Sequence, residues 1–593
     1  MPGSPAAAAE LVETPPERPA DTSIEQLGFE RQPMVRWFDP TQLAQTSIRV
    51  ALSTIFGAYA DKRELQAAFE EPPRVHRDHA AEDELWLDFV ADLGDGFRST
   101  YALAYLLSRP TLDFEGTTLP RTPVLVMGGD QVYPTASREE YENRTLGPYR
   151  AALPWTPPGT SPQLFAIPGN HDWYDGLTNF IRFFCQDGWI GGWQTKQNRS
   201  YFAIQLPHRW WLWAIDIQFD VYIDKPQLDY FREVADELLP GDRVILVSGK
   251  PSWKHGTDRP NPSYDNLRYL EEKVIEPNGR LVVSLTGDDH HYARYEEQTT
   301  RAEKRQKVTA GGGGAFTSAT HHLRNGLQLR RRYDDGSASY ALRQAFPEKH
   351  VSRRLTWWAL LRLWTRNWRF LRLVVAAYLV PAILLQIPMR RDLARGGDAS
   401  PWDLWWAAVS SKYVLYAALV VVPLLVLFVP AKSMLLRVPL GAAHAAVHLF
   451  VLLAGFVALA AWFLTDVLDT RWATRYDLLV AVVGALAAAL PGVILLAVYL
   501  AICDRVFGER LGRHTTEVFA CQALEDHKNF LRLHIDRDGA LTIYPIAVDD
   551  VSGVDLTFRA EGVPEDPYFE PTKPITTRLI EEPITVPAAE PAS

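Results

Sequence analysis

Apolar residues are concentrated in one block of the chain, from about residue 371 to residue 502. Four runs in this block are long and apolar enough to cross a bilayer, which takes roughly 20 residues as a helix. Four such runs in succession favour a bundle of four transmembrane helices over buried helices of a soluble domain. The predicted spans are residues 370–387, 407–429, 442–464 and 478–502.

The flanks of these runs predict how the chain lies in a membrane. Lys and Arg are more frequent before the first run, between the second and third, and after the fourth than on the opposite side. Positive loops stay in the cytoplasm. We therefore expect a multi-pass protein of the cell membrane, its N- and C-terminal soluble parts facing the cytoplasm. Residues 351–369 interleave tryptophans with arginines at near-helical spacing, which predicts an amphipathic helix at the interface.

Outside the apolar block the hydrophobic runs are short and alternate with turns and helical patterns. Six runs between residues 85 and 285 have the length and composition of buried strands. They are residues 85–90, 123–127, 163–167, 211–217, 244–247 and 281–285. Residues 29–350 are therefore predicted to form a soluble α/β domain, followed by a membrane domain over residues 370–505.

The segment after the membrane block has strand-like alternation again. Residues 530–534 and 541–546 alternate in polarity, with a turn at 536–539. We expect residues 506–563 to pack back on the soluble domain. Residues 1–28 are rich in Ala, Pro and Glu, and residues 564–593 in Pro, Glu and Thr, so both ends are predicted to be disordered tails, the second of them acidic.

Composition then excludes two classes of protein. Among 593 residues, Asp and Glu outnumber Lys and Arg by 71 to 61, which argues against a general nucleic-acid binder. Three scattered cysteines exclude a disulfide scaffold and contain no CxxC pair for structural zinc.

Five of the predicted strands are followed at once by polar or glycine-rich residues. Functional groups gather at the carboxyl ends of strands in an α/β sheet. Asp, Asn, His and Tyr there supply oxygen and imidazole ligands that suit Mn, Fe or Zn. Two such ions sharing one carboxylate can hold a phosphoester and activate a water. The five sets are Asp92-Leu93-Gly94-Asp95, Gly128-Gly129-Asp130-Gln131-Val132-Tyr133, Gly169-Asn170-His171-Asp172, Ser248-Gly249-Lys250-Pro251 and Gly287-Asp288-Asp289-His290-His291.

In this order the sets resemble the motifs of the calcineurin-like metallophosphoesterase family, in particular those of purple acid phosphatases. The resemblance covers roughly residues 85–320, and Gly169-Asn170-His171-Asp172 is its most specific part. It implies an α/β metallophosphoesterase fold, a β-sandwich flanked by helices, to which the four transmembrane helices add an all-α bundle.

The resemblance also implies a role for each matching residue. Asp92 and His290 correspond to ligands of a first metal ion, and Tyr133 to a metal-bound tyrosinate. Asp130 corresponds to the carboxylate that bridges two ions, and Asn170 to a ligand of the second. His171 corresponds to the histidine that protonates the leaving group or stabilises the transition state, with Asp172 as its orienting partner.

The sequence departs from the family's motifs at two positions, and both concern the ligands of the second metal ion. Asp288 stands where the family has a histidine, although a carboxylate can still bind a metal. Lys250 precedes Pro251 where the family has another histidine, and its ammonium can replace part of the second ion's charge against a phosphate oxygen. Three alternatives remain: two divalent or trivalent ions (Mn, Fe or Zn) with a weakened second site, one ion plus Lys250, or an inactive site.

The sequence thus predicts a membrane-bound, metal-dependent phosphoesterase. Its substrate would be a phosphomonoester or phosphodiester, attacked by a metal-bound hydroxide. The arginines and tryptophans before the first span favour a lipid-linked or membrane-proximal substrate. The alternative is a catalytically degenerate sensor that binds a phosphorylated ligand and is anchored in the bilayer. The sequence does not indicate the oligomeric state.

Overall fold

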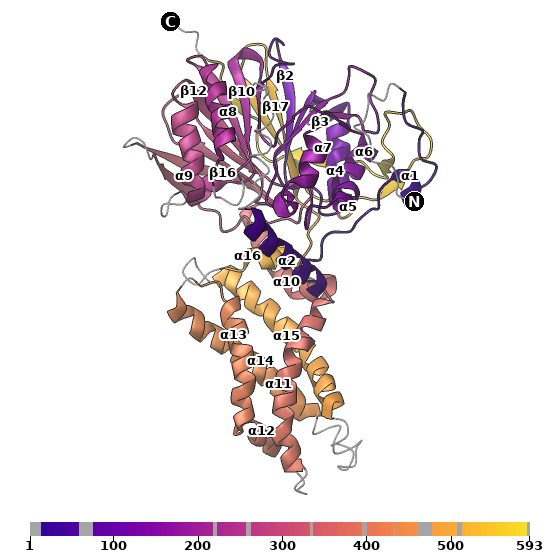
Figure 1. The fold of residues 1–593 in the computed structure, drawn as a ribbon, viewed down its shortest axis with the longest axis vertical. Helices are drawn as coiled ribbons and strands as arrows, with labels where there is room; N and C mark the ends of the chain where they lie inside the picture. The colour runs from indigo at the N-terminus through magenta and orange to yellow at the C-terminus, as the bar shows by residue number, and fades with distance from the viewer. Residues whose placement is uncertain are drawn as a thin grey trace. The chain divides into compact units, whose positions relative to one another are not determined.

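Two units make up the chain in a computed structural model (Figure 1). One consists of Met1–Val35, Thr46–Ser352 and Leu524–Ser593, and the other of Arg36–Gln45 and Arg353–Ala523. The described residues are 14–57, 75–114, 116–217, 222–256, 262–331, 336–393, 400–431, 433–459, 477–506 and 513–589.

The first unit contains two large mixed sheets. Sheet A runs in the order β1 (Val75–His76), β9 (Phe202–Gln205), β10 (Trp210–Ile215), β11 (Asp242–Ser248), β12 (Gly279–Thr286), β14 (Gln306–Ala310), β13 (Tyr292–Glu297), β16 (Ser337–Phe346) and β15 (Gly326–Arg330). Sheet B runs in the order β21 (Thr577–Leu579), β18 (Leu541–Val548), β17 (Lys528–Ile535), β2 (Leu85–Val90), β5 (Val124–Met127), β6 (Gln163–Ala166), β8 (Trp193–Thr195) and β7 (Trp189–Ile190), and β22 (Ile584–Val586) also pairs with β18. Two short hairpin-like pairs join β3 (Thr111–Phe114) to β4 (Thr117–Pro120) and β19 (Leu556–Phe558) to β20 (Phe569–Pro571).

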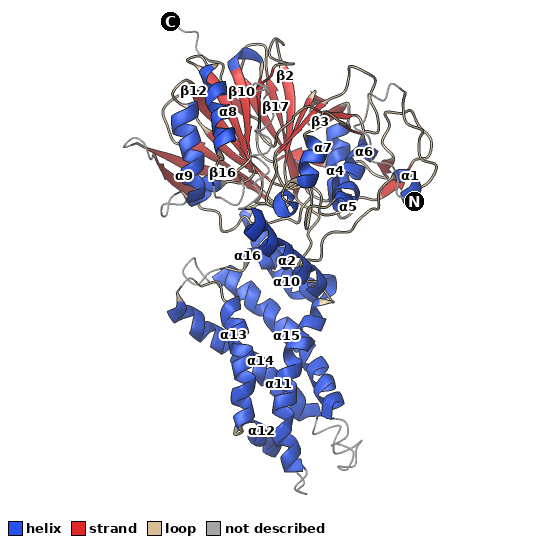
Figure 2. Ribbon diagram, in the orientation of Figure 1, coloured by secondary structure: helices blue, strands red, loops and turns tan. Residues whose placement is uncertain are grey.

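One apolar core lies between the two sheets and combines residues of both, such as Phe89 and Val126 of sheet B with Leu212 and Ile245 of sheet A. Helices pack on the outer faces, so strands such as β5 and β11 are buried along their whole length (Figure 2). The first unit is therefore a mixed α/β structure, as the sequence predicts. Its helices are α1 (Ile24–Leu27), α4 (Phe97–Ser108), α5 (Arg138–Tyr141), α6 (Gly147–Ala152), α7 (Thr178–Phe184), α8 (Lys225–Asp236) and α9 (Pro262–Tyr269). Short 3₁₀ or π turns are η1 (Glu142–Leu146), η2 (Asp172–Asp175), η3 (Pro207–Arg209), η5 (Ser252–His255) and η6 (Leu270–Ile275).

The segment after the apolar block supplies inner strands of sheet B. β17 pairs antiparallel with β2, with Leu531 opposite Phe89, and β18 pairs with the other edge of β17. The apolar block is therefore inserted in the sequence of the first unit, whose sheet B needs residues from both sides of it.

The expectation of disordered tails is wrong for the part of each tail that the structure describes. Arg18 donates hydrogen bonds to backbone carbonyls between Arg559 and Pro567, and α1 follows. β21 and β22 belong to sheet B, and Ile584 and Val586 are buried in its core. The C-terminal tail is polar on average, so its composition does not indicate these apolar residues, which alternate with polar ones. Residues 1–13 and 590–593 lie outside the described residues.

The second unit is helical, and three of its helices are long and apolar enough to cross a membrane: Phe370–Met389, Met434–Leu459 and Ala481–Val506. The predicted span 407–429 is broken instead, with Pro401–Val409 and Lys412–Phe428 inclined by 68°. Ser411 begins the second piece as its N-cap, a position that serine favours. The described part thus has three helices that could cross a membrane, or four such segments if the bent pair is one. Residues 460–464 of the predicted third span lie outside it. The helices are α10 (Lys349–Arg366), α11 (Phe370–Leu393), α12 (Pro401–Val409), α13 (Lys412–Phe428), α14 (Met434–Leu459), α15 (Asp477–Val506) and α16 (Thr515–Ala520), and α2 (Pro40–Gly57) begins in this unit.

Helix α10 covers most of the residues predicted to form the interfacial helix. Trp357, Leu361, Trp364 and Trp368 are all more than 40% exposed, and the first three lie on one face of α10 at helical spacing. Arg372 lies over the Trp368 ring at 5.1 Å. Exposed indoles beside arginines are typical of the membrane–water interface.

Candidate metal centre

The loops that carry the predicted site residues converge in the first unit. Strands β2, β5 and β6 are parallel neighbours in sheet B, and β11 and β12 are parallel neighbours in sheet A. The loops after them touch: the Asp92 N–H donates to the Gly129 carbonyl at 2.9 Å, and the Asp288 N–H donates to Asp92 Oδ1 at 3.1 Å. A Cβ on Gly129 would lie 3.3 Å from the Gly249 Cα. Loops from both sheets therefore meet at one place.

The Tyr133 hydroxyl lies at the centre of this place. Its oxygen is 3.1 Å from Asp92 Oδ1, 3.2 Å from Asp130 Oδ2 and 3.0 Å from His290 Nε2. His290 Nδ1 lies 2.9 Å from the Phe316 carbonyl, which can only accept, so Nδ1 carries the proton and Nε2 a lone pair. Three acceptors thus surround a phenol that has one proton to donate.

Negative charge accumulates at the same point. Asp92 is fully buried, and its Oδ2 has no hydrogen-bond partner among the residues that the structure describes. Burial, and then repulsion from Asp130 and Asp288, raises the pKa of Asp92 well above its usual range. Burial together with the charge of Asp288 raises the pKa of Asp130 to about 7. These carboxylates cannot all be ionised without a positive charge among them.

The donor set fits a cation of the first transition series. Asp92, Asp130, Tyr133 and His290 would hold it through carboxylate, phenolate and imidazole groups. Glycines leave room beside two of them: a Cβ on Gly311 would lie 2.2 Å from Asp92 Oδ2, and one on Gly169 would lie 2.1 Å from Asp130 Oδ1. No three His, Cys, Asp or Glu side chains of the described residues converge on one point that could hold a metal ion. The set therefore depends on the Tyr133 oxygen.

Lys250 brings positive charge to the side of the second predicted ion. Its ammonium lowers the pKa of both Asp130 and Asp288, although burial, the larger effect, leaves both raised overall. Repulsion from Asp289 raises the pKa of Asp288 further, and Lys254 counters it by binding both oxygens of Asp289 at 2.6 Å. The charges of two lysines thus favour an ionised Asp288, whose own charge raises the pKa of Asp130.

The expectation that Asp172 orients the His171 ring is wrong. His171 Nδ1 lies 2.8 Å from the Pro134 carbonyl, and the His171 N–H donates to Asp130 Oδ1 at 2.8 Å. Asp172 instead accepts hydrogen bonds from the Gly169 N–H at 2.8 Å, the Gln131 N–H and the Tyr141 hydroxyl. It joins the Asp130 loop to the Asn170 loop, because its side chain points back along its own turn.

The glycine run 311–314, which lies outside the five motif sets, encloses Asp92 from another side. The Gly313 N–H donates to the Ala91 carbonyl and the Ala315 N–H to the Asp92 carbonyl, at 2.8 and 2.9 Å. A Cβ on Gly313 would lie 2.5 Å from the Ala91 oxygen. Close backbone packing therefore requires glycine at these positions. The sequence already indicates such packing, because four glycines follow one another at 311–314.

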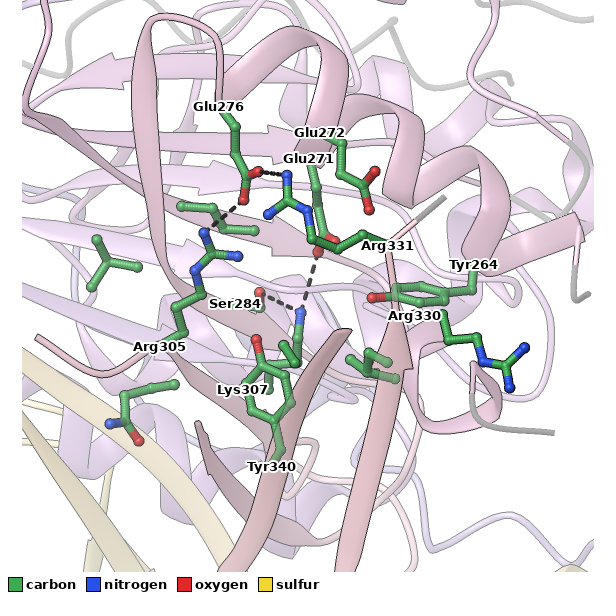
Figure 3. A pocket seen from close by; sticks show the side chains of 15 residues that line it. Tyr264, Glu271, Glu272, Glu276, Ser284, Arg305, Lys307, Arg330, Arg331 and Tyr340 are labelled. Atoms are coloured by element: carbon green, nitrogen blue, oxygen red, sulfur yellow. Dashed lines mark hydrogen bonds and ion pairs between the residues drawn. The ribbon is translucent and has the colours of Figure 1, made fainter. Parts of the chain in front are cut away.

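A separate pocket of about 450 Å³, open to solvent, lies beside β12 and β14 (Figure 3). Five of its charged side chains form ion pairs: Lys307 with Glu271 at 3.2 Å, and Arg305 and Arg331 with Glu276. None of the predicted site residues lines it. The candidate chemistry therefore belongs to the loops around Tyr133.

Comparisons with known proteins give a distant structural neighbour. No family model and no curated protein matches the chain. Among solved structures it is similar to a purple acid phosphatase isolated from yellow lupin (Lupinus luteus) seeds, at 12% identity and a TM-score of 0.26. The match covers 46% of this chain and 50% of that one, so the chain spans about half the length of this neighbour. A likeness this distant carries no argument, and the function rests on the site.

Proposed function

We propose that this chain is a membrane-bound, metal-dependent phosphoesterase. The observation that carries the proposal is the surrounding of the Tyr133 hydroxyl by three acceptors, on Asp92, Asp130 and His290. Buried acceptors without matching donors are costly unless a cation lies among them. Metal ions bound there would activate a water and neutralise the charge of a phosphate group.

The chain's own residues then position the substrate and move protons. The ammonium of Lys250, whose charge lowers the pKa of both Asp130 and Asp288, would bind a phosphate oxygen. Burial lowers the pKa of His171 to about 4, and its Nδ1 donates to the Pro134 carbonyl. His171 Nε2 therefore carries a lone pair near neutral pH and accepts a proton or hydrogen bond. A bound phosphate dianion would raise the pKa of His171 and let it protonate a leaving group.

The exposed tryptophans of α10 favour a lipid-linked or membrane-proximal phosphoester as substrate. The distribution of Lys and Arg favours placing both soluble parts in the cytoplasm. Turnover of phospholipids and of soluble nucleotides by the detergent-solubilised chain tests the lipid version. Equal or better turnover of the nucleotides would reject it.

A sensor that binds a phosphorylated ligand without cleaving it is the second candidate. Lys250 favours it, because an ammonium stands where a second metal ligand is expected. Hydrolysis of a chromogenic phosphodiester with added Mn²⁺ separates the two functions. Activity that requires Mn²⁺ and Asp130 supports the enzyme, whereas folded, metal-loaded protein that binds phosphate but hydrolyses nothing supports the sensor.

A further inference from the structure

The side-chain amide of Asn170 has a partner on one side only. Its Nδ2 donates a hydrogen bond of 3.2 Å to the Tyr174 hydroxyl. Its Oδ1 accepts no hydrogen bond from any residue that the structure describes. Because the nitrogen and oxygen of an amide point away from each other, the bond to Tyr174 leaves the oxygen for another partner. An amide can bind a cation only through that oxygen.

Asn170 lies against the carboxylate that the proposed function places between two ions. The residue before it, Gly169, approaches so closely that a Cβ there would lie 2.1 Å from Asp130 Oδ1. The residue after it, His171, donates its N–H to the same oxygen at 2.8 Å. The backbone on both sides of Asn170 is thus fixed against Asp130, and only the orientation of the amide remains to be set.

Tyr174 is held firmly enough to set that orientation. It belongs to η2, which begins at Asp172, and the Asp172 carboxylate binds the Gly169 N–H. The Tyr174 ring packs edge-on against the His171 ring, with centroids 4.9 Å apart. The hydroxyl therefore keeps one position relative to Asn170.

We propose that Tyr174 is a positioning residue for the second metal ion. Its hydroxyl accepts the Asn170 Nδ2 hydrogen bond, and this directs Asn170 Oδ1 to the cation. Without this bond the amide can rotate and present its nitrogen, which repels a cation. The inference rests on the proposed function and adds to it a residue that controls how well the second site fills.

Tyr174→Phe tests the role of the hydroxyl, because it keeps the ring and its contact with His171. The probe is Mn²⁺ alone, added to the full-length chain in detergent, with free Mn²⁺ measured by electron paramagnetic resonance. Affinity for the weaker of two ions should fall about 10- to 100-fold, as when other partners of metal ligands are removed, and the tighter ion should be unaffected. Tyr149→Phe is the control, because that buried hydroxyl has no hydrogen-bond partner within the described ranges, and this variant should bind Mn²⁺ like wild type.

Repeating the Tyr174→Phe substitution in an Asn170→Asp protein distinguishes a loss of amide orientation from general damage to the site. In Asn170→Asp the side chain presents two equivalent oxygens and needs no orienting partner, so adding Tyr174→Phe should have no measurable effect on Mn²⁺ affinity. The same loss in both backgrounds, or no loss in Tyr174→Phe alone, would overturn the inference and leave the phosphoesterase proposal intact. A wild type that binds a single Mn²⁺ would overturn the inference but retain a one-ion enzyme, and one that binds none would overturn both.

Discussion

Arg532 donates two hydrogen bonds of 2.8 Å to the carboxylate of Asp88, and neither residue is more than 1% exposed. They face each other across the β17–β2 pair, and Thr122 donates to Asp88 Oδ2 at 3.0 Å. Asp88 lies before the apolar block in the sequence and Arg532 after it. This buried ion pair therefore joins the two segments of the chain that build sheet B.

Removing one partner of this pair should destabilise the first unit strongly. Arg532→Met leaves Asp88 buried without a counter-charge, at a cost of about 3–5 kcal/mol. The thermal unfolding midpoint should fall by several degrees. Asp88→Leu combined with Arg532→Met should cost less than Arg532→Met alone, because no charge is then buried. The pair Arg578–Asp549, with both side chains nearly half exposed, is the control, and Arg578→Met should cost less than about 1 kcal/mol.

Lys528 should make stability depend on pH in the alkaline range. It is fully buried, and burial lowers the pKa of its ammonium from 10.5 to about 8, although Asp526 and Asp95 partly oppose this. Between these two pH values the unfolded chain holds a proton that the folded chain has lost. Stability should therefore rise with pH from about 8 to 10.5, by up to about 1.4 kcal/mol per pH unit.

The measurement for Lys528 is a difference between two proteins. Thermal midpoints of wild type and Lys528→Met are compared from pH 7 to pH 10, because other groups titrate equally in both. The thermal midpoint of wild type should rise relative to that of Lys528→Met as pH increases. A constant difference would show that the Lys528 proton is not lost in this range.

Gly311→Ala should weaken metal binding. The added Cβ would lie 2.2 Å from Asp92 Oδ2 and 2.4 Å from the Asp289 carbonyl, so the Asp92 side chain or the loop must move. Mn²⁺ binding and the thermal midpoint should both fall. Gly188→Ala is the matched control, since its Cβ would make an ordinary contact of 3.5 Å with Thr195 Oγ1. Unchanged Mn²⁺ affinity in Gly311→Ala would mean that Asp92 is not a ligand.

Lys250→His should increase binding of a second ion. The change removes a positive charge that repels a cation near Asp130 and Asp288, and supplies an imidazole nitrogen. The number of Mn²⁺ bound per chain, or the affinity for the weaker ion, should rise. Lys250→Met removes the charge without adding a ligand and should give a smaller increase. Identical Mn²⁺ binding in wild type and Lys250→His would indicate that this position does not face the second site.

The sequence predicted those features that depend on strand ends and spacing. Asp92, Asp130, Tyr133 and His290 lie together because each follows a strand whose carboxyl end meets the others. Their chemical roles remain predictions. The alternation at 530–534 and 541–546 corresponds to β17 and β18.

Other features depend on contacts that spacing does not encode. Asp172 follows His171 directly, yet its side chain turns to the Gly169 and Gln131 N–H groups because the turn that η2 begins directs it there. The second predicted span breaks at Ser410 and Ser411, which a hydropathy average does not register. The C-terminal tail is rich in Pro and Glu on average, yet Ile580, which follows β21, and Ile584 of β22 both lie in the core.

The most direct test of the central claim is Mn²⁺-dependent hydrolysis of a chromogenic phosphodiester by the full-length chain, compared between wild type and Asp130→Asn. Wild type should be active, a chelator should remove the activity, and Mn²⁺ should restore it. Asp130→Asn should lose both this activity and Mn²⁺ binding while keeping its fold. Metal-independent activity, or full activity in Asp130→Asn, would show that the chain is not a phosphoesterase that acts through a metal ion bound at Asp130.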